Sequence, residues 1–299
     1  MIITPKIIAW ATISRILFTI HGTMLVWIVV EMKKDKLYWI LLIGLILLCL
    51  EVVLTLYATE KGEWKWFSPT VFLYLSSTIP SIFLLELDFL QHRIQLKNSA
   101  LNSTLNSTQQ MAEEINFNIY STWLKTLEQT MILALVMVRW VMPKGEMNRI
   151  QLSELLLIYI ALGADILDIL GLIKEPELET SWAVNIVGLS IFSWALLQFT
   201  LVLTQTQSTE SISNNTSLDA KCSYVSSCCT SEVWSLLIAV GMQDGPFLIF
   251  RLYVMIKEEV LNEMMIFFIC KNILTVAIEI YRIFVIQCAD QHHKKKMGI

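Results

Sequence analysis

The distribution of apolar positions along the chain predicts a helical membrane protein. A helix needs roughly 20 mostly apolar residues to cross the hydrocarbon core of a bilayer, and eight segments approach that length. These segments are residues 7–30, 37–57, 67–85, 123–142, 152–172, 182–203, 233–256 and 264–286. The sequence therefore predicts an all-α fold: a polytopic membrane bundle of about eight transmembrane helices in a single domain, residues 1–299.

Two longer polar stretches, residues 87–122 and 204–230, separate the apolar segments. Both are rich in Ser, Thr and Asn, a composition typical of exposed loops. The first contains acceptor patterns for N-glycosylation at Asn102 and Asn106, so it is expected to face the lumen or the outside. The second contains the same patterns at Asn214 and Asn215. Three predicted spans separate the two loops, so both cannot be luminal if all eight segments cross.

The charges flanking the segments give only a weak indication of orientation. Placing both termini in the cytosol divides the Lys and Arg residues almost equally between the two sides. The C-terminal QHHKKK and the acceptor patterns of the first loop agree with each other and favour cytosolic termini. The EMKKDK turn opposes this orientation. The first segment has no cleavage site of the secretory type, so it is expected to remain in the protein as a membrane span. The protein is expected to lie in the plasma membrane or the secretory pathway.

Overall composition supports the membrane assignment and excludes several other classes. Hydrophobic residues make up 55% of the chain and charged residues only 16%. The net charge is -4, without a basic cluster, so nucleic acid is not an expected partner, whereas membrane lipid is. The six cysteines do not form a zinc-binding spacing with histidines, and no metal or cofactor is expected.

The seventh segment contains a polar interruption, GMQDGPFLIFR, at residues 241–251. Gly245 and Pro246 both oppose a continuous helix, and Asp244 is placed to cap a helix that restarts after it. The sequence therefore predicts a broken span with an acid at the break. In transporters, discontinuous helices of this kind often form the substrate or ion site.

Ionisable side chains at membrane depth are the other candidates for function, because burying them is costly and they usually face a bundle interior or a wet cavity. The candidates for an intramembrane polar site are Arg15, Glu51, Asp165, Asp168, Asp244, Arg251 and Lys271. Asp165 and Asp168 are three residues apart and share a helix face, so with Asp244 they are expected to form an acidic surface for a cation. The alternative is that each acid pairs with a basic residue and fixes helix packing.

Several stretches resemble the transmembrane protein 26 family. They are KWFSPTVFLYLSSTIPSIFLLEL from Lys65, GADILD from Gly163, QDGPFLIFRL from Gln243 and KNILTVAIEIYRI from Lys271. The resemblance runs from Tyr38 into the eighth segment and departs in the two polar loops and in a short tail. It implies a glycosylated multi-pass protein at the cell surface and supplies no catalytic residues.

Two functions are compatible with these observations. The first is a bundle that binds or conducts a small ion or polar solute near the interruption. The second is a surface receptor, adhesion or scaffold protein whose intramembrane charges only hold helices together. An enzyme is not expected, since no nucleophile, metal-ligand cluster or phosphate-binding loop accompanies the acids. The sequence does not indicate a particular protein partner.

Overall fold

A computed structural model of the protein describes residues 5–58, 67–101, 107–142, 149–201, 237, 240–260 and 262–297. The chain divides into two compact units, Met1–Thr200 and Leu201–Ile299. Within the described residues, every regular element is a helix, which confirms the predicted all-α fold. The expectation of a single domain stays a prediction.

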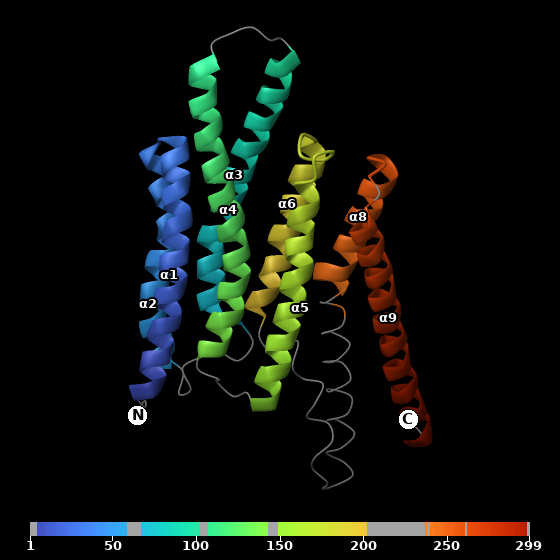
Figure 1. Ribbon diagram of the computed structural model, residues 1–299. Coiled ribbons are helices and arrows are strands. Elements are labelled where there is room, and N and C mark those ends of the chain that lie inside the picture. Colours follow the sequence, from blue (N-terminus) through green and yellow to red (C-terminus); the bar gives the residue numbers. More distant parts are fainter. Residues whose placement is uncertain are drawn as a thin grey trace. The chain divides into compact units, whose positions relative to one another are not determined.

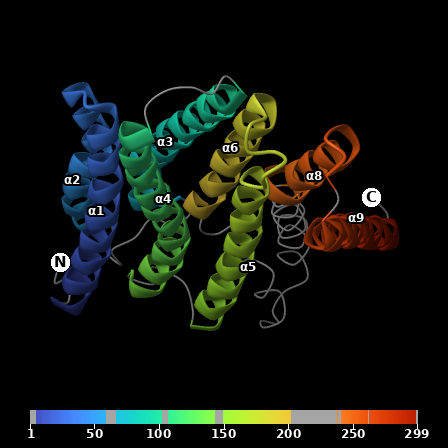
Figure 2. The ribbon, with the colours of Figure 1, turned by 45° about the horizontal axis from the view of Figure 1, so that its top comes forward.

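The first unit is a bundle of six α-helices (Figure 1). They are α1 (Pro5–Lys33), α2 (Ile43–Ala58), α3 (Pro69–Leu101), α4 (Ser107–Val141), α5 (Arg149–Ile173) and α6 (Trp182–Leu196). Two 3-10 turns complete it, η1 (Lys36–Leu42) before α2 and η2 (Leu197–Thr200) after α6. Helix α1 packs against α2, α3 and α4, while α6 packs against α3 and α5 (Figure 2).

The turn between α1 and α2 follows from local backbone chemistry. Lys34 adopts a left-handed conformation with φ 51°, which ends α1. The side chain of Asp35 then accepts a hydrogen bond from the backbone N–H of Leu37 at 2.9 Å and caps η1. The chain therefore reverses within a few residues and returns along α1.

Helices α2 and α3 approach each other closely at Gly44. A Cβ atom at this position would lie 2.8 Å from the carbonyl oxygen of Leu73, closer than side chains tolerate. Beside it, the Ser77 hydroxyl donates a hydrogen bond to the carbonyl oxygen of Leu41 at 2.6 Å. Small residues that let backbones touch are the usual means of packing helices in a membrane, where lipid competes for apolar contacts.

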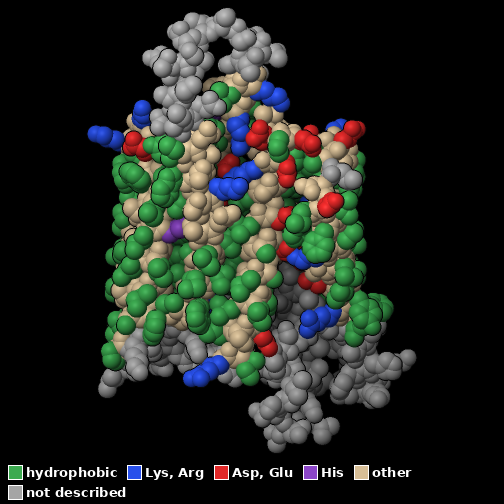
Figure 3. All heavy atoms as spheres, in the orientation of Figure 1, with side chains coloured by type: hydrophobic (Ala, Val, Ile, Leu, Met, Phe, Trp, Pro, Cys, Tyr) green, Lys and Arg blue, Asp and Glu red, His purple; other side chains and the backbone are tan. Residues whose placement is uncertain are grey.

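The outer surfaces of the helices are those of a membrane protein. Hydrophobic side chains cover the middle of the visible face, and charged side chains gather toward its upper end (Figure 3). Six described segments are long and apolar enough to cross a bilayer: Ile8–Lys33, Lys36–Ala58, Pro69–Lys97, Arg149–Ile173, Trp182–Thr200 and Glu263–Val285. They coincide with six of the eight predicted segments. A multi-pass membrane bundle is therefore confirmed, whereas the count of eight spans stays a prediction.

The prediction of a polar loop over residues 87–122 is wrong. Helix α3 continues to Leu101 and α4 already begins at Ser107, so most of this stretch is helical. Its Gln, Glu, Met, Leu and Ala residues have high helix propensity, and the low hydropathy that suggested a loop does not prevent a helix. Asn102 and Asn106, like the second polar loop at residues 204–230, lie outside the described residues.

The second unit contains a π-helical turn, η4 (Val240–Asp244), followed directly by α8 (Gly245–Lys257) and then by α9 (Glu263–Met297). Both η4 and α8 pack against α9. Asp244 stands at the N-cap position of α8, as predicted, with Pro246 in the first turn of the helix. The predicted break is wrong, because Asp244 is itself helical (φ -61°, ψ -42°) and its side chain makes no capping hydrogen bond. Pro246 lacks an N–H, and its ring clashes with the preceding turn of an α-helix, so the chain widens into a π-turn and does not stop.

Candidate functional site

A group of buried polar side chains lies where η4 and α8 meet α9. We call it the polar stripe and define it as Gln243, Asp244, Arg251, Asn272 and Glu279. The first four are buried, Arg251 and Asn272 completely, and Glu279 is half-buried. The interruption recognised in the sequence thus supplies three of its members: Gln243 and Asp244 lie in the π-turn, and Arg251 lies in α8.

Arg251 is held between two aromatic rings. Its Cζ atom lies 5.6 Å from the ring centre of Phe247 on its own helix and 4.8 Å from that of Phe268 on α9. Lys271 extends over the same Phe268 ring, with its Nζ atom 5.7 Å from the centre. Aromatic faces attract cations most strongly when water is excluded. Arg251 therefore places positive charge within the stripe, and Lys271 places positive charge beside it.

Asn272 and Glu279 have unused hydrogen-bonding capacity. Neither amide atom of Asn272 has a hydrogen-bond partner among the described residues, and the same holds for the Oε2 atom of Glu279. The spacing from Phe268 to Asn272 to Glu279 keeps all three on the face of α9 that packs against α8. Glu279 also lies within electrostatic range of Asp244 and Arg282. The stripe therefore combines both signs of charge with a buried amide that is not satisfied.

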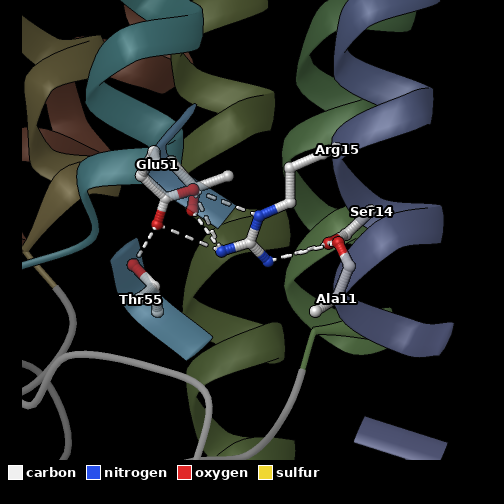
Figure 4. A network of polar contacts seen from close by, with 6 residues as sticks. Ala11, Ser14, Arg15, Glu51 and Thr55 are labelled. Carbon is white, nitrogen blue, oxygen red and sulfur yellow. Dashed lines mark hydrogen bonds and ion pairs between the residues drawn. The ribbon is translucent and has the colours of Figure 1, made fainter. Parts of the chain in front are cut away.

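Two of the other predicted site residues, Arg15 and Glu51, form an ion pair between α1 and α2 (Figure 4). Both side chains are buried. The five N–H donors of Arg15 reach both carboxylate oxygens of Glu51 (3.2 Å each), the hydroxyls of Thr70 (2.7 Å) and Ser14 (3.1 Å), and the carbonyl oxygen of Ala11 (3.4 Å). Glu51 accepts a further hydrogen bond from Thr55 at 2.5 Å. This network links α1, α2 and α3, and every N–H group of Arg15 has its hydrogen-bond partner within the protein.

The remaining predicted acids, Asp165 and Asp168, lie on α5 in the first unit. Asp165 is buried and Asp168 is half-buried. Both have interaction partners, as do Asp244, Arg251 and Lys271. Since Asp244 belongs to the second unit, the shared acidic surface expected from the sequence stays a prediction.

Comparison with known families identifies the chain. The family model of transmembrane protein 26 matches residues 7–282, which cover most of both units and the whole polar stripe. The chain belongs to the transmembrane protein 26 family. No solved structure matches it. Family membership supports a membrane protein with several apolar helices, and it assigns no specific activity.

In this member of the transmembrane protein 26 family, sequence analysis missed a second buried polar cluster. Glu86 of α3 and Glu128 of α4 are both almost fully buried, and both contact the ammonium group of Lys174, which follows α5. The Nζ atom of Lys174 lies 2.8 Å from Oε1 of Glu86 and 2.5 Å from Oε2 of Glu128. Burial alone would lower the pKa of Lys174, but the carboxylates of Glu128 and Glu86 outweigh it and raise that pKa above its ordinary value. Lys174 therefore remains charged at neutral pH.

His21 is a packing residue in this family member and not a metal ligand. Its Nε2 atom lies 3.0 Å from the carbonyl oxygen of Leu127, so Nε2 must donate the hydrogen bond. Its Nδ1 atom then accepts from the Tyr74 hydroxyl at 2.8 Å, and the Tyr74 ring stacks on Phe18 with the ring centres 4.0 Å apart. Among the described residues, no group of three or more His, Cys, Asp or Glu side chains could hold a metal ion.

Proposed function

We propose that the protein binds a small ion or polar solute at the polar stripe and transports it across the membrane. The observation that carries this proposal is Asn272, a fully buried side chain without a hydrogen-bond partner among the described residues. A buried polar group left unpaired costs about 1–3 kcal/mol of stability, a cost that a bound solute would offset.

The chemistry of the stripe suits a small polar ligand. The Asn272 amide offers both a donor and an acceptor, and the free Oε2 atom of Glu279 adds a second acceptor. The π-turn that carries Asp244 is a rare element, frequent at functional sites. Binding and transport of this kind require no chemical reaction, so the proposed function is not that of an enzyme.

Replacing Asn272 with leucine is expected to abolish solute binding while preserving or raising the stability of the solute-free protein. The leucine removes the unsatisfied amide but also removes the hydrogen bonds offered to the solute. The purified full chain is tested with Na⁺, K⁺, Cl⁻ and a panel of amino acids, by melting temperature in detergent and by flux in liposomes. A solute at 100 times its Kd stabilises the wild type by about 2.7 kcal/mol and leaves N272L unchanged.

Thr275→Val is the matched control for this experiment. Thr275 lies one turn further along α9, and its hydroxyl already donates to the carbonyl oxygen of Lys271 at 2.9 Å. The control is expected to keep the wild-type response. The proposal fails if N272L retains wild-type flux, or if the wild type responds to no member of the panel.

A receptor, adhesion or scaffold role is the second candidate, and the Arg15–Glu51 network favours it. Every donor of that buried arginine is bonded within the protein, so these intramembrane charges act as a helix clamp. If the charges of the stripe have the same role, the wild type shows no solute flux. These charges would then contribute only to the stability of the bundle.

Glycosylation at Asn102 and Asn106 is part of the proposal, with both termini in the cytosol of a plasma-membrane or secretory-pathway protein. Replacing both asparagines with glutamine is expected to remove the mobility shift that enzymatic deglycosylation produces on a gel. The matched control replaces Asn214 and Asn215, which lie on the cytosolic side in this orientation, and leaves the shift intact. The opposite result would reverse the orientation.

A further inference from the structure

Helices α3 and α6 lie side by side (Figure 2) and border a groove of about 500 Å³. Aromatic side chains line it from both helices, Phe72 and Phe83 from α3 and Trp194 from α6. Phe72 and Trp194 are exposed, and both helices belong to segments that are able to cross a bilayer, so the groove opens toward lipid. Its size and its mostly apolar lining are those of a site for a small molecule.

Backbone contacts fix the walls of the groove. The N–H group of Ser68, just before α3, donates a hydrogen bond to the carbonyl oxygen of Thr200 at the end of η2, at 2.8 Å. The hydroxyl group of Tyr159 on α5 donates to the carbonyl oxygen of Phe199 at 3.0 Å. The chain that follows α6 is therefore tied to both α3 and α5, and the groove is formed before a ligand enters.

A backbone acceptor lies in the lining of the groove. Pro80 lies inside α3 and has no N–H group. The carbonyl oxygen of Ser76, four residues earlier, therefore lacks its α-helical hydrogen bond, and both residues line the groove. The hydrocarbon core holds no water, so a carbonyl oxygen freed in this way needs a donor from a neighbouring group.

The serine hydroxyl groups of the lining do not add donors. Ser76, Ser190 and Ser193 each donate the hydroxyl proton to a carbonyl oxygen of their own helix, at 2.7 Å. A hydroxyl group has one proton and two lone pairs, so these serines can only accept further hydrogen bonds. Among the described lining residues, the one other polar side chain, Trp194, has an interaction partner of its own. The groove therefore suits an apolar molecule that brings a donor.

We propose that this groove binds a membrane sterol, whose hydroxyl group donates a hydrogen bond to the carbonyl oxygen of Ser76. In a bilayer the surrounding lipid is as apolar as the groove, so affinity depends on close packing and on hydrogen bonds. The fused rings of a sterol are rigid and lose little conformational freedom when they pack against the aromatic side chains. The acyl chain of a phospholipid is flexible and has no donor.

Competition between a sterol and its ketone tests the hydrogen bond without any substitution. The full chain in phosphatidylcholine nanodiscs is labelled with a photoactivatable cholesterol, and the labelled peptides are identified by mass spectrometry. We expect labels on the parts of α3 and α6 that line the groove. Cholesterol is expected to compete about five- to tenfold better than cholestenone, which accepts but cannot donate, since one hydrogen bond is lost. Equal competition by the ketone, or labelling by a photoactivatable phosphatidylcholine that cholesterol does not displace, would show that the proposal is wrong.

Pro80→Ala tests the acceptor, because alanine supplies the N–H group that the Ser76 carbonyl oxygen lacks. We expect P80A to melt at the wild-type temperature or above it and to bind cholesterol and cholestenone equally. A preference for cholesterol that persists in P80A would overturn the assignment of this carbonyl oxygen as the acceptor, and with it the proposal.

Ser193→Leu tests the place of binding, because leucine fills the groove from α6. We expect S193L to keep the wild-type melting temperature and to lose the labelling of the groove. Ser153→Leu is the matched control: Ser153 is an exposed serine of α5 outside the groove, and its hydroxyl group also donates to its own helix at 2.7 Å. S153L is expected to be labelled as the wild type is. Undiminished labelling of S193L would contradict the proposal.

Discussion

Replacing Glu51 with glutamine is expected to lower the free energy of unfolding by about 3–5 kcal/mol. The substitution keeps the shape of the side chain but leaves the buried Arg15 guanidinium without its counter-charge. Breaking one half of a buried ion pair costs more than the pair itself contributes, because a desolvated charge remains. The measurement is denaturant or thermal unfolding of the purified chain in detergent micelles.

A double substitution tests whether the lost counter-charge is the cause. Replacing Arg15 with methionine in the E51Q protein removes the uncompensated charge, and most of the lost stability is expected to return. Glu263→Gln, which removes an exposed glutamate in the first turn of α9, is the control for a change of net charge. If the double variant is as unstable as E51Q, the ion pair is not the source of the effect and the prediction is wrong.

Replacing Gly245 with alanine is expected to destabilise the π-turn by about 1–3 kcal/mol and to abolish solute-dependent stabilisation at the polar stripe. The new Cβ atom would lie 2.7 Å from the carbonyl oxygen of Val240. That oxygen is part of the backbone, so it can move only if the turn that carries Asp244 changes shape. The loss is measured as a lower melting temperature without solute and as no rise in melting temperature when solute is added.

Gly241→Ala is the matched control for the π-turn. Gly241 lies in the same turn, but a Cβ atom there meets no other heavy atom within 4 Å. Alanine also has the higher helix propensity, so G241A is expected to be as stable as the wild type or more stable. If the two alanines destabilise the protein equally, the contact with the Val240 carbonyl oxygen is not the reason why the turn excludes a side chain.

The sequence predicted the membrane helices well because the bilayer fixes the length of an apolar run. The segments at residues 152–172 and 264–286 agree closely with α5 and with the apolar part of α9. The helical extensions at residues 87–101 and 107–122 were missed, since hydropathy reports contact with lipid and not helix formation. A helix that continues beyond the bilayer has the same composition as an exposed loop.

The site was predicted less completely, for two reasons. Gly245 and Pro246 indicate a disturbed helix, but a break and a π-turn have the same signature in one sequence. Asn272 was missed because it carries no charge, and at membrane depth ionisable side chains are the ones whose burial costs most. Glu86, Glu128 and Lys174 meet from separate elements, and nothing in the local sequence of any of them indicates the contact.

The closed network around Arg15 has a consequence for the surrounding lipid. An arginine at membrane depth ordinarily draws water and phosphate headgroups inward, and the bilayer thins around it. All the N–H groups of Arg15 are already bonded to Glu51, Thr70, Ser14 and Ala11. None is left for a headgroup, so we expect the bilayer beside α1 and α2 not to thin around this buried charge.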